Sequence, residues 1–189
     1  MKKIMFNDKF GLTDAVLQGR KTVTRRIYTE DIYGESTIED NPPRIDEVQR
    51  GINSKHIKSH LAKYKIGEVI AIAQSYQNIG LGDCGSAAWT NKMFVKSELM
   101  PHQIEILNVR VERLQDITEE DSLLEGIEVV SKGMCDVAGA VCWYGIKGTN
   151  ITREYTPRDA FTKLIDKLSG SGTWEKNPYV FRYEFKLIK

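Results

Sequence analysis

The residues best suited to chemistry are gathered near the N-terminus, in the run Gly19-Arg20-Lys21-Thr22-Val23-Thr24-Arg25-Arg26. The run holds four cations and two hydroxyl groups, which can donate hydrogen bonds to a phosphate, a carbonyl oxygen or the edge of a base. In a regular strand, Thr22, Thr24 and Arg26 would share one face. Lys21 would then point away, and it meets Thr24 only across a kink or a helical turn. The alternative is an exposed basic edge that binds nothing.

Other residue types give weaker patterns. His56 and His60 have the i, i+4 spacing of two metal ligands, but no glutamate follows the first histidine and no third ligand is near, so a surface helix is favoured. Cys84, Cys135 and Cys142 form no paired motif and are interpreted as free thiols. The sequence therefore predicts no metal site, no disulfide framework and no cofactor.

Two aromatic residues precede the last predicted strand. Trp174 and Tyr179 could stack on a nucleobase. A tryptophan at such a position more often fills a gap in the core, and this interpretation is favoured for Trp174.

Three helices are expected around the basic run and further along the chain. The spacing of apolar residues predicts a short helix over 12–18, ended by Gly19. Thr118 begins a second helix in the manner of a capping box, and Thr156 with Pro157 begins a third. The apolar stripe of the second helix would be Leu123, Leu124 and Ile127, and that of the third would be Phe161, Leu164, Ile165 and Leu168.

Strands are expected between and after these helices. Residues 69–73 are a continuous apolar run of buried-strand length, and Met93–Val95 is a short candidate. The alternation over 104–111 changes phase at Leu107-Asn108, which predicts a β-bulge. Alternation is clearest over 181–187, with aromatic residues on one face and charged residues on the other.

Composition limits the class of protein. The chain has 189 residues, of which 41% are apolar, and its 27 basic and 26 acidic side chains give a net charge of +1. These values exclude a disordered charged tail and a protein that coats nucleic acid through bulk charge. The charge is nevertheless uneven, because residues 1–26 carry 7 − 2 = +5 and residues 112–136 carry 2 − 8 = −6. The two segments are either solvated faces that pair with each other or the walls of a cleft for an anionic ligand.

The same composition bears on location and domain organisation. No leader-like apolar run follows the N-terminus and no segment approaches the length of a membrane span, so a cytoplasmic protein without a membrane partner is expected. We predict a single α+β domain over 1–189, a mostly antiparallel β-core with peripheral helices. Residues 28–62 and 128–155 are expected to be insertions, and Val129–Tyr155, which has no clear period, a long loop.

Several segments together resemble the ASCH domain family of the PUA-like superfamily. The pattern Gly19-x-Lys21-Thr22-x-Thr24-x-Arg26 is similar to the family signature. Three later segments are similar to the family's turn into a core strand, its strand-to-helix element and its closing strand. They are Tyr64–Ile70, Leu114–Ile127 and Trp174–Phe185.

This resemblance implies a small β-barrel whose cleft binds RNA or a modified nucleoside. In that cleft, ligand contacts would come from Arg20, Thr22, Arg25 and Arg26. One group within the family, the bacterial N4-acetylcytidine amidohydrolases, has a similar Lys-x-x-Thr-x-Arg run and a glutamate on a later helix. By position, the resemblance implies Thr24 as nucleophile, Lys21 as its activator and Glu125 as the acidic partner.

Three functions therefore follow from the sequence. The first is binding of RNA or a modified nucleoside in a basic cleft. The alternative is an amidohydrolase acting on an N-acylated nucleobase such as N4-acetylcytidine. The third is a protein-interaction module without catalysis. The sequence predicts no oligomeric state.

Overall fold

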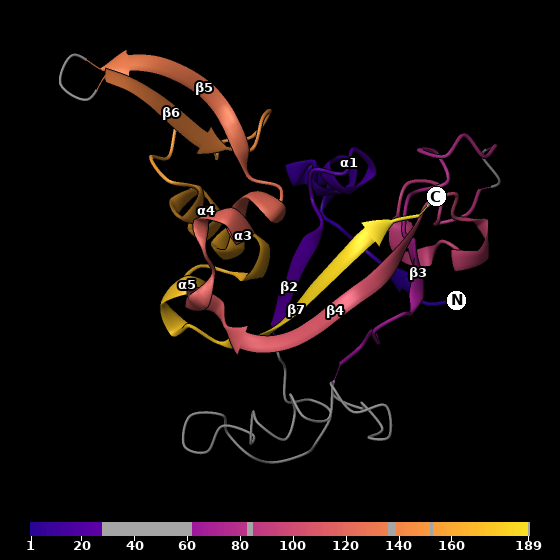
Figure 1. Ribbon diagram of the computed structural model, residues 1–189. Helices are drawn as coiled ribbons and strands as arrows, with labels where there is room; N and C mark the ends of the chain where they lie inside the picture. Colours follow the sequence, from indigo (N-terminus) through magenta and orange to yellow (C-terminus); the bar gives the residue numbers. More distant parts are fainter. Residues whose placement is uncertain (28–61, 83–84, 136–138, 152, 189) are drawn as a thin grey trace.

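The computed structural model describes residues 1–27, 62–82, 85–135, 139–151 and 153–188. It is an α+β fold with a five-stranded, mostly antiparallel sheet, as predicted, and a separate two-stranded sheet (Figure 1). The strand order of the larger sheet is β1-β3-β4-β7-β2. Its strands are β1 (Lys3–Ile4), β3 (Val69–Ile72), β4 (Gln103–Arg113), β7 (Tyr179–Leu187) and β2 (Val23–Ile27).

The described strands do not close into the predicted barrel. β1 and β2 lie at opposite edges of the sheet and do not pair with each other. β1 has only two residues, and both are used in its parallel pairing with β3. With two residues, β1 presents few backbone groups on its other edge, and the sheet stays open within the described ranges.

The centre of the sheet is the long antiparallel pair of β4 and β7. Its register shifts between Ile106 and Asn108, which confirms the predicted bulge. Tyr183 and Phe185 of β7 are buried in the core, as the alternation predicted. β2 pairs with the other side of β7, so Thr24 lies opposite Tyr183.

The helices lie beside this sheet, and their ends follow the capping residues. They are α1 (Leu12–Leu17), α3 (Glu119–Leu124), α4 (Pro157–Ser169) and α5 (Thr173–Lys176). Short 3-10 turns cover Asp8–Phe10, Lys92–Phe94, Ser97–Leu99 and Leu114–Asp116. Thr118 and Thr156 accept backbone hydrogen bonds at the starts of α3 and α4, which confirms both predicted helix starts. Gly19 follows α1 with φ +72°, as its predicted role at the helix end requires.

Two local predictions are wrong for identifiable reasons. The expected strand at Met93–Val95 is a 3-10 turn, because the Asn91 side chain accepts a hydrogen bond from the Met93 backbone and turns the chain. The expected apolar stripe of α3 is also wrong in part. Leu123 and Leu124 are each 39% exposed, and α3 buries Ser122 instead. The orientation of this six-residue helix is set by the contacts of its polar residues rather than by burial of its leucines.

The expected long loop over 129–155 contains a β-hairpin. β5 (Glu128–Cys135) and β6 (Gly139–Gly145) pair antiparallel and extend away from the larger sheet (Figure 1). Their register shifts between Val129 and Ser131, which disrupts the alternation that would have indicated a strand.

The main core lies between the sheet and the helices. Trp174 is partly buried and packs against this core, with its ring 6.4 Å from that of Phe161 in an edge-to-face arrangement, which supports the favoured core interpretation. His56, His60, Cys84 and the expected insertion over 28–62, except Ala62, lie outside the described residues. No helix within the described ranges has the length and apolar character needed to cross a membrane.

Candidate active site around Lys21, Thr24 and Glu125

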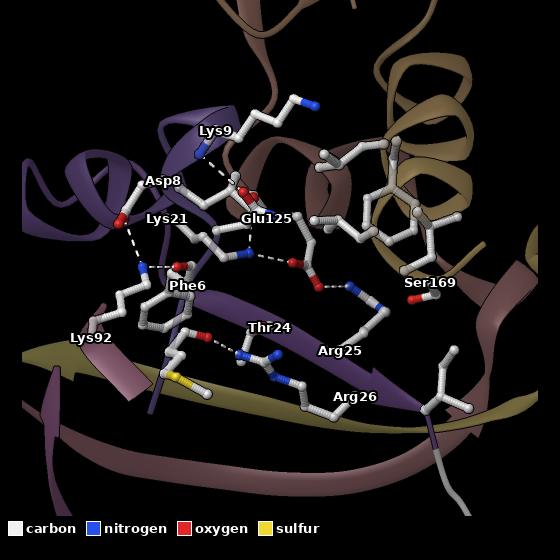
Figure 2. Close-up of a pocket in the computed structure, with 18 residues that line it drawn as sticks. Phe6, Asp8, Lys9, Lys21, Thr24, Arg25, Arg26, Lys92, Glu125 and Ser169 are labelled. Carbon is white, nitrogen blue, oxygen red and sulfur yellow. Dashed lines mark hydrogen bonds and ion pairs between the residues drawn. The ribbon is translucent and has the colours of Figure 1, made fainter. Parts of the chain in front are cut away.

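A cavity of about 660 Å³ lies between β2, the segment before α1, the end of α3 and one face of α4 (Figure 2). It brings together Lys21, Thr24 and Glu125, which the sequence analysis selected, with Arg25 and Arg26 beside them. Its other lining residues are Met5, Phe6, Asn7, Asp8, Lys9, Leu12, Ile27, Lys92, Phe161, Leu164, Ile165, Leu168 and Ser169. One end of the cavity is therefore polar and charged, and α4 supplies a mostly apolar wall.

Lys21 reaches the cavity because the chain turns sharply before β2. Gly19 adopts a left-handed conformation, and the backbone amides of Arg20 and Lys21 both donate to the carbonyl oxygen of Ala15. β2 begins only at Val23, so Lys21 is outside the strand. This is the kink that the strand pattern required for Lys21 and Thr24 to face the same space.

Glu125 is held at the end of α3 and points at Lys21. The Lys21 ammonium donates to the Glu125 carboxylate Oε2 and, at 2.9 Å, to the Glu125 backbone oxygen. Their side chains are only 2% and 5% exposed. The following Gly126 has φ +101°, a conformation that favours glycine at the end of a helix. The pair joins positions that are 104 residues apart in the sequence.

Burial dominates the acid-base behaviour of Lys21. Loss of water around the ammonium lowers the pKa of Lys21, and this outweighs the opposing attraction of Glu125. The positive charges of Arg26 and Arg25 lower the pKa further. A lysine in such surroundings loses its proton more easily than an exposed one, so a larger fraction of it is neutral and able to accept a proton.

Thr24 lines the same cavity from β2. Its side chain is buried, and its hydroxyl group has no hydrogen-bond partner among the described residues. A buried hydroxyl in a cavity is free to bind a ligand atom or to act as a nucleophile once a base is near. No hydrogen bond joins Thr24 to Lys21 or Glu125 in the described structure.

Arg25 is almost fully buried and is saturated by carboxylates. Its Nε donates to Glu112 at 2.8 Å, and its Nη2 lies 2.6 Å from Asp121. Its Nη1 donates to Glu125 Oε1 at 3.2 Å. The side chain is 1% exposed, so the guanidinium is held inside the protein.

Arg26 has the opposite character. Its side chain is exposed, and its Nη2 donates to the backbone oxygen of Met5 at 2.6 Å. Its guanidinium lies 5.9 Å from the ring of Phe6, which also faces Lys21 at 6.0 Å. Arg26 therefore remains within reach of a ligand at the mouth of the cavity.

Arg25 belongs to a row of three arginines that crosses three strands. The register pairs Arg25 of β2 with Arg182 of β7, and Arg182 with Arg110 of β4. Like charges at paired positions repel each other, and carboxylates from α3 and β4 offset this repulsion. Asp121 bonds Arg182 at 2.9 Å and 3.1 Å in addition to Arg25, and Glu112 lies 3.3 Å from Arg110. We call Arg25, Arg182 and Arg110 the arginine row.

The arginine row anchors α3 to the sheet. Burial alone would raise the pKa of Asp121, but the hydrogen bonds from Arg182 and Arg25 lower it below its usual range. The basic N-terminal segment and the acidic middle segment thus meet through buried ion pairs. Sequence reasoning missed Asp121, Arg110 and Arg182. The alignment of the arginines depends on a strand register that pairs residues 182 − 110 = 72 positions apart, which no local pattern reveals.

Two of the predicted ligand contacts lie elsewhere. Arg20 lines a second cavity of about 390 Å³, where it lies 3.6 Å from Glu128 and hydrogen-bonds Gln18. Thr22 does not line the 660 Å³ cavity, and its backbone joins neighbouring segments: its amide donates to Leu124, and its oxygen accepts from Phe185. The structure thus gathers five of the seven predicted site residues in the larger cavity.

The polar end of the cavity, away from α4, holds a second small network. Lys92 lies 2.7 Å from Asp8, and it also donates to the backbone oxygen of Phe6. Thr13 donates to the same carboxylate. Neither Lys92 nor Asp8 was singled out by the sequence, since each stands alone among residues of mixed type.

No group of three or more histidine, cysteine, aspartate or glutamate residues suited to a metal ion occurs in the part of the chain that the structure describes. Comparisons with protein-family models, with curated proteins and with solved structures find no match. The site must therefore be interpreted from its own chemistry.

Proposed function

We propose that this chain is a PUA-like protein of the ASCH type that binds one modified nucleoside in the 660 Å³ cavity. The observation that carries the proposal is the division of the cavity into two parts. A buried Lys21, Thr24 and Glu125 set lies on one side and the apolar face of α4 on the other. A nucleobase needs both, because its faces are apolar and its edges carry hydrogen-bonding groups.

The state of the cations favours a single base over a long RNA backbone. Lys21 and Arg25 are buried and bonded to carboxylates, so their charges are not offered to phosphates. Of the cations that line the cavity, Arg26 and Lys9 are exposed, and the half-buried Lys92 is paired with Asp8. Binding should therefore depend mainly on contacts with the base, and only weakly on attraction to a charged backbone.

Calorimetric titration with N4-acetylcytidine, cytidine and a short single-stranded RNA tests this proposal. We expect the modified nucleoside to bind more tightly than cytidine. Raising the salt concentration from 50 to 200 mM should weaken its binding by no more than about threefold, as for one phosphate contact or none. Absence of nucleoside binding, or tight RNA binding with a steep salt dependence, would contradict it.

A second candidate is hydrolysis of an N-acylated base, and the Thr24 hydroxyl, which has no hydrogen-bond partner among the described residues, favours it. In this mechanism neutral Lys21 accepts the Thr24 proton while Thr24 Oγ attacks the amide carbonyl carbon. The C–N bond then breaks, and the amine of the base leaves with the proton from Lys21. Water hydrolyses the resulting threonine ester, releasing the carboxylic acid and restoring the hydroxyl. Glu125 keeps Lys21 directed into the cavity.

Two threonine variants separate turnover from binding. Thr24→Ala should reduce release of acetate from N4-acetylcytidine by at least about a thousandfold and leave nucleoside affinity nearly unchanged. Thr22→Ala is the matched control, because Thr22 lies two residues away and outside the cavity, and it should retain activity. If the parent protein binds the nucleoside but releases no acetate, the binding proposal stands and the hydrolytic candidate fails.

A further inference from the structure

The arginine row raises the question of what Arg25 does for the pair beside it. Arg25 is buried and faces Glu125 from the side opposite Lys21, as Figure 2 shows. Glu125 uses one carboxylate oxygen, Oε2, for Lys21 and the other, Oε1, for Arg25. The negative charge of Glu125 is therefore shared between two cations.

We propose that Arg25 is a positioning residue that divides the Glu125 carboxylate between itself and Lys21. By holding Oε1, Arg25 fixes the rotation of the carboxylate and leaves a single oxygen for the ammonium. By its own positive charge it opposes the charge on Lys21. Arg25 thereby keeps Lys21 ready to give up its proton and does not itself contact the ligand.

The geometry supports this role over ligand binding. Its three nitrogens each have a carboxylate partner, from Glu112, Asp121 and Glu125. A guanidinium held at three points has little freedom to turn toward a ligand. Without Arg25, Glu125 would be free to give both oxygens to Lys21, and the ammonium form would become more stable.

The surroundings of Lys21 define what else acts on its charge. Glu125 lies beside it at the end of α3, and Arg25 and Arg26 lie on β2. Asp8, Lys9 and Lys92 line the same cavity. Desolvation lowers the pKa of Lys21, and the charges of Arg26 and Arg25 act in the same direction. Removal of the Arg25 charge should therefore raise this pKa.

Arg182 provides a matched control. It is buried to a similar degree, occupies the paired position on β7 and bonds Asp121, but it makes no hydrogen bond to Glu125. Loss of Arg182 should weaken the arginine row as loss of Arg25 does. It should not free the Oε1 atom of Glu125.

The test is a pH titration of Lys21 in the whole 189-residue chain without ligand, monitored by NMR of ¹³C-labelled lysine. Arg25→Met should move the titration midpoint of Lys21 to higher pH, with an increase of about tenfold in proton affinity. Arg25→Lys keeps the charge but cannot span three carboxylates, so its midpoint should lie between those of Arg25→Met and the parent. Arg182→Met should leave the midpoint close to that of the parent.

An unchanged midpoint in Arg25→Met, or an equal shift in Arg182→Met, would overturn the proposal, because Arg25 would then have only a structural role. If Arg25→Met does not fold, Arg25→Lys decides by the same criterion: a midpoint above that of the parent supports the proposal, and one equal to it overturns it. The inference rests on the proposed function only where it gives Lys21 a role toward a bound nucleoside. Nucleoside titration of the parent tests that function separately, so the two can fail independently.

Discussion

Two neighbouring cations, Arg20 and Lys21, enter two different cavities and meet very different surroundings. Lys21 is 2% exposed and pairs with Glu125, whereas the Arg20 side chain is 38% exposed and lies 3.6 Å from Glu128. An exposed pair gains little, since water screens it, whereas a buried pair is strongly coupled and its protonation states shift. The difference shows that burial of the side chain, rather than the density of charge along the sequence, decides which cation has altered acid-base behaviour.

The largest expected effect on stability comes from removing the carboxylate of the buried pair, with the exposed pair as the comparison. Glu125→Gln leaves Lys21 with no carboxylate at its ammonium and should lower the free energy of unfolding by about 3 kcal/mol. Glu128→Gln removes a partly solvated partner and should cost less than about 1 kcal/mol. Chemical denaturation at neutral pH measures both. Equal losses would show that the two cavities do not differ in the way described.

A glycine at the boundary of the two cavities gives a smaller effect. Gly126 has φ +101°, and an added Cβ would lie 3.5 Å from Ala15 and 3.6 Å from the Cβ of Lys21. Gly126→Ala should cost about 1–2 kcal/mol through backbone strain and should disturb the Lys21 environment. Gly148→Ala, at φ +75° with no atom within 4 Å, should cost about 1 kcal/mol and leave Lys21 unaffected. Thermal unfolding and lysine NMR together distinguish the two variants.

The smallest effect is the pH dependence of stability. Because the folded protein lowers the pKa of Lys21 below the ordinary 10.5, the unfolded chain binds more protons between the two values. Lys21 therefore makes the protein more stable as the pH rises toward 10.5. Lys21→Met should flatten this rise relative to the parent, whereas Lys147→Met, at an exposed lysine, should keep it. Unfolding free energies measured from neutral pH upward test this, and an identical slope in Lys21→Met would contradict the buried-lysine account.

The sequence predicted those parts of the structure that depend on local rules. Thr118 and Thr156 mark helix starts because their side chains cap the nearest backbone amides, and the bulge near Asn108 follows from a change of phase. Local rules fail where distant segments decide the outcome. Leu123 and Leu124 look like a buried stripe, but the arginine row holds α3 by Asp121 and leaves them exposed.

The candidate site was predictable to a similar extent. The composition of the run from Gly19 to Arg26 indicated a site, and the family resemblance selected Glu125 as the partner of Lys21. Apart from that resemblance, nothing in the composition of the run distinguished the outward Arg20 from the inward Lys21. That choice depends on the left-handed turn at Gly19 and on the contact of Lys21 with Glu125, 104 positions later.

The pairing of β2 with β7 also has a consequence for synthesis. β2 ends at Ile27, yet its only strand partner among the described residues begins at Tyr179, 179 − 27 = 152 positions later. Contacts this far apart in sequence form late and slow the overall rate of folding. On the ribosome, β2 with its Thr24 has no β7 beside it until the segment through Leu187 has emerged. The cavity is consequently completed only after β7 has been synthesised, and a chain truncated before Tyr179 would lack the strand that supports β2.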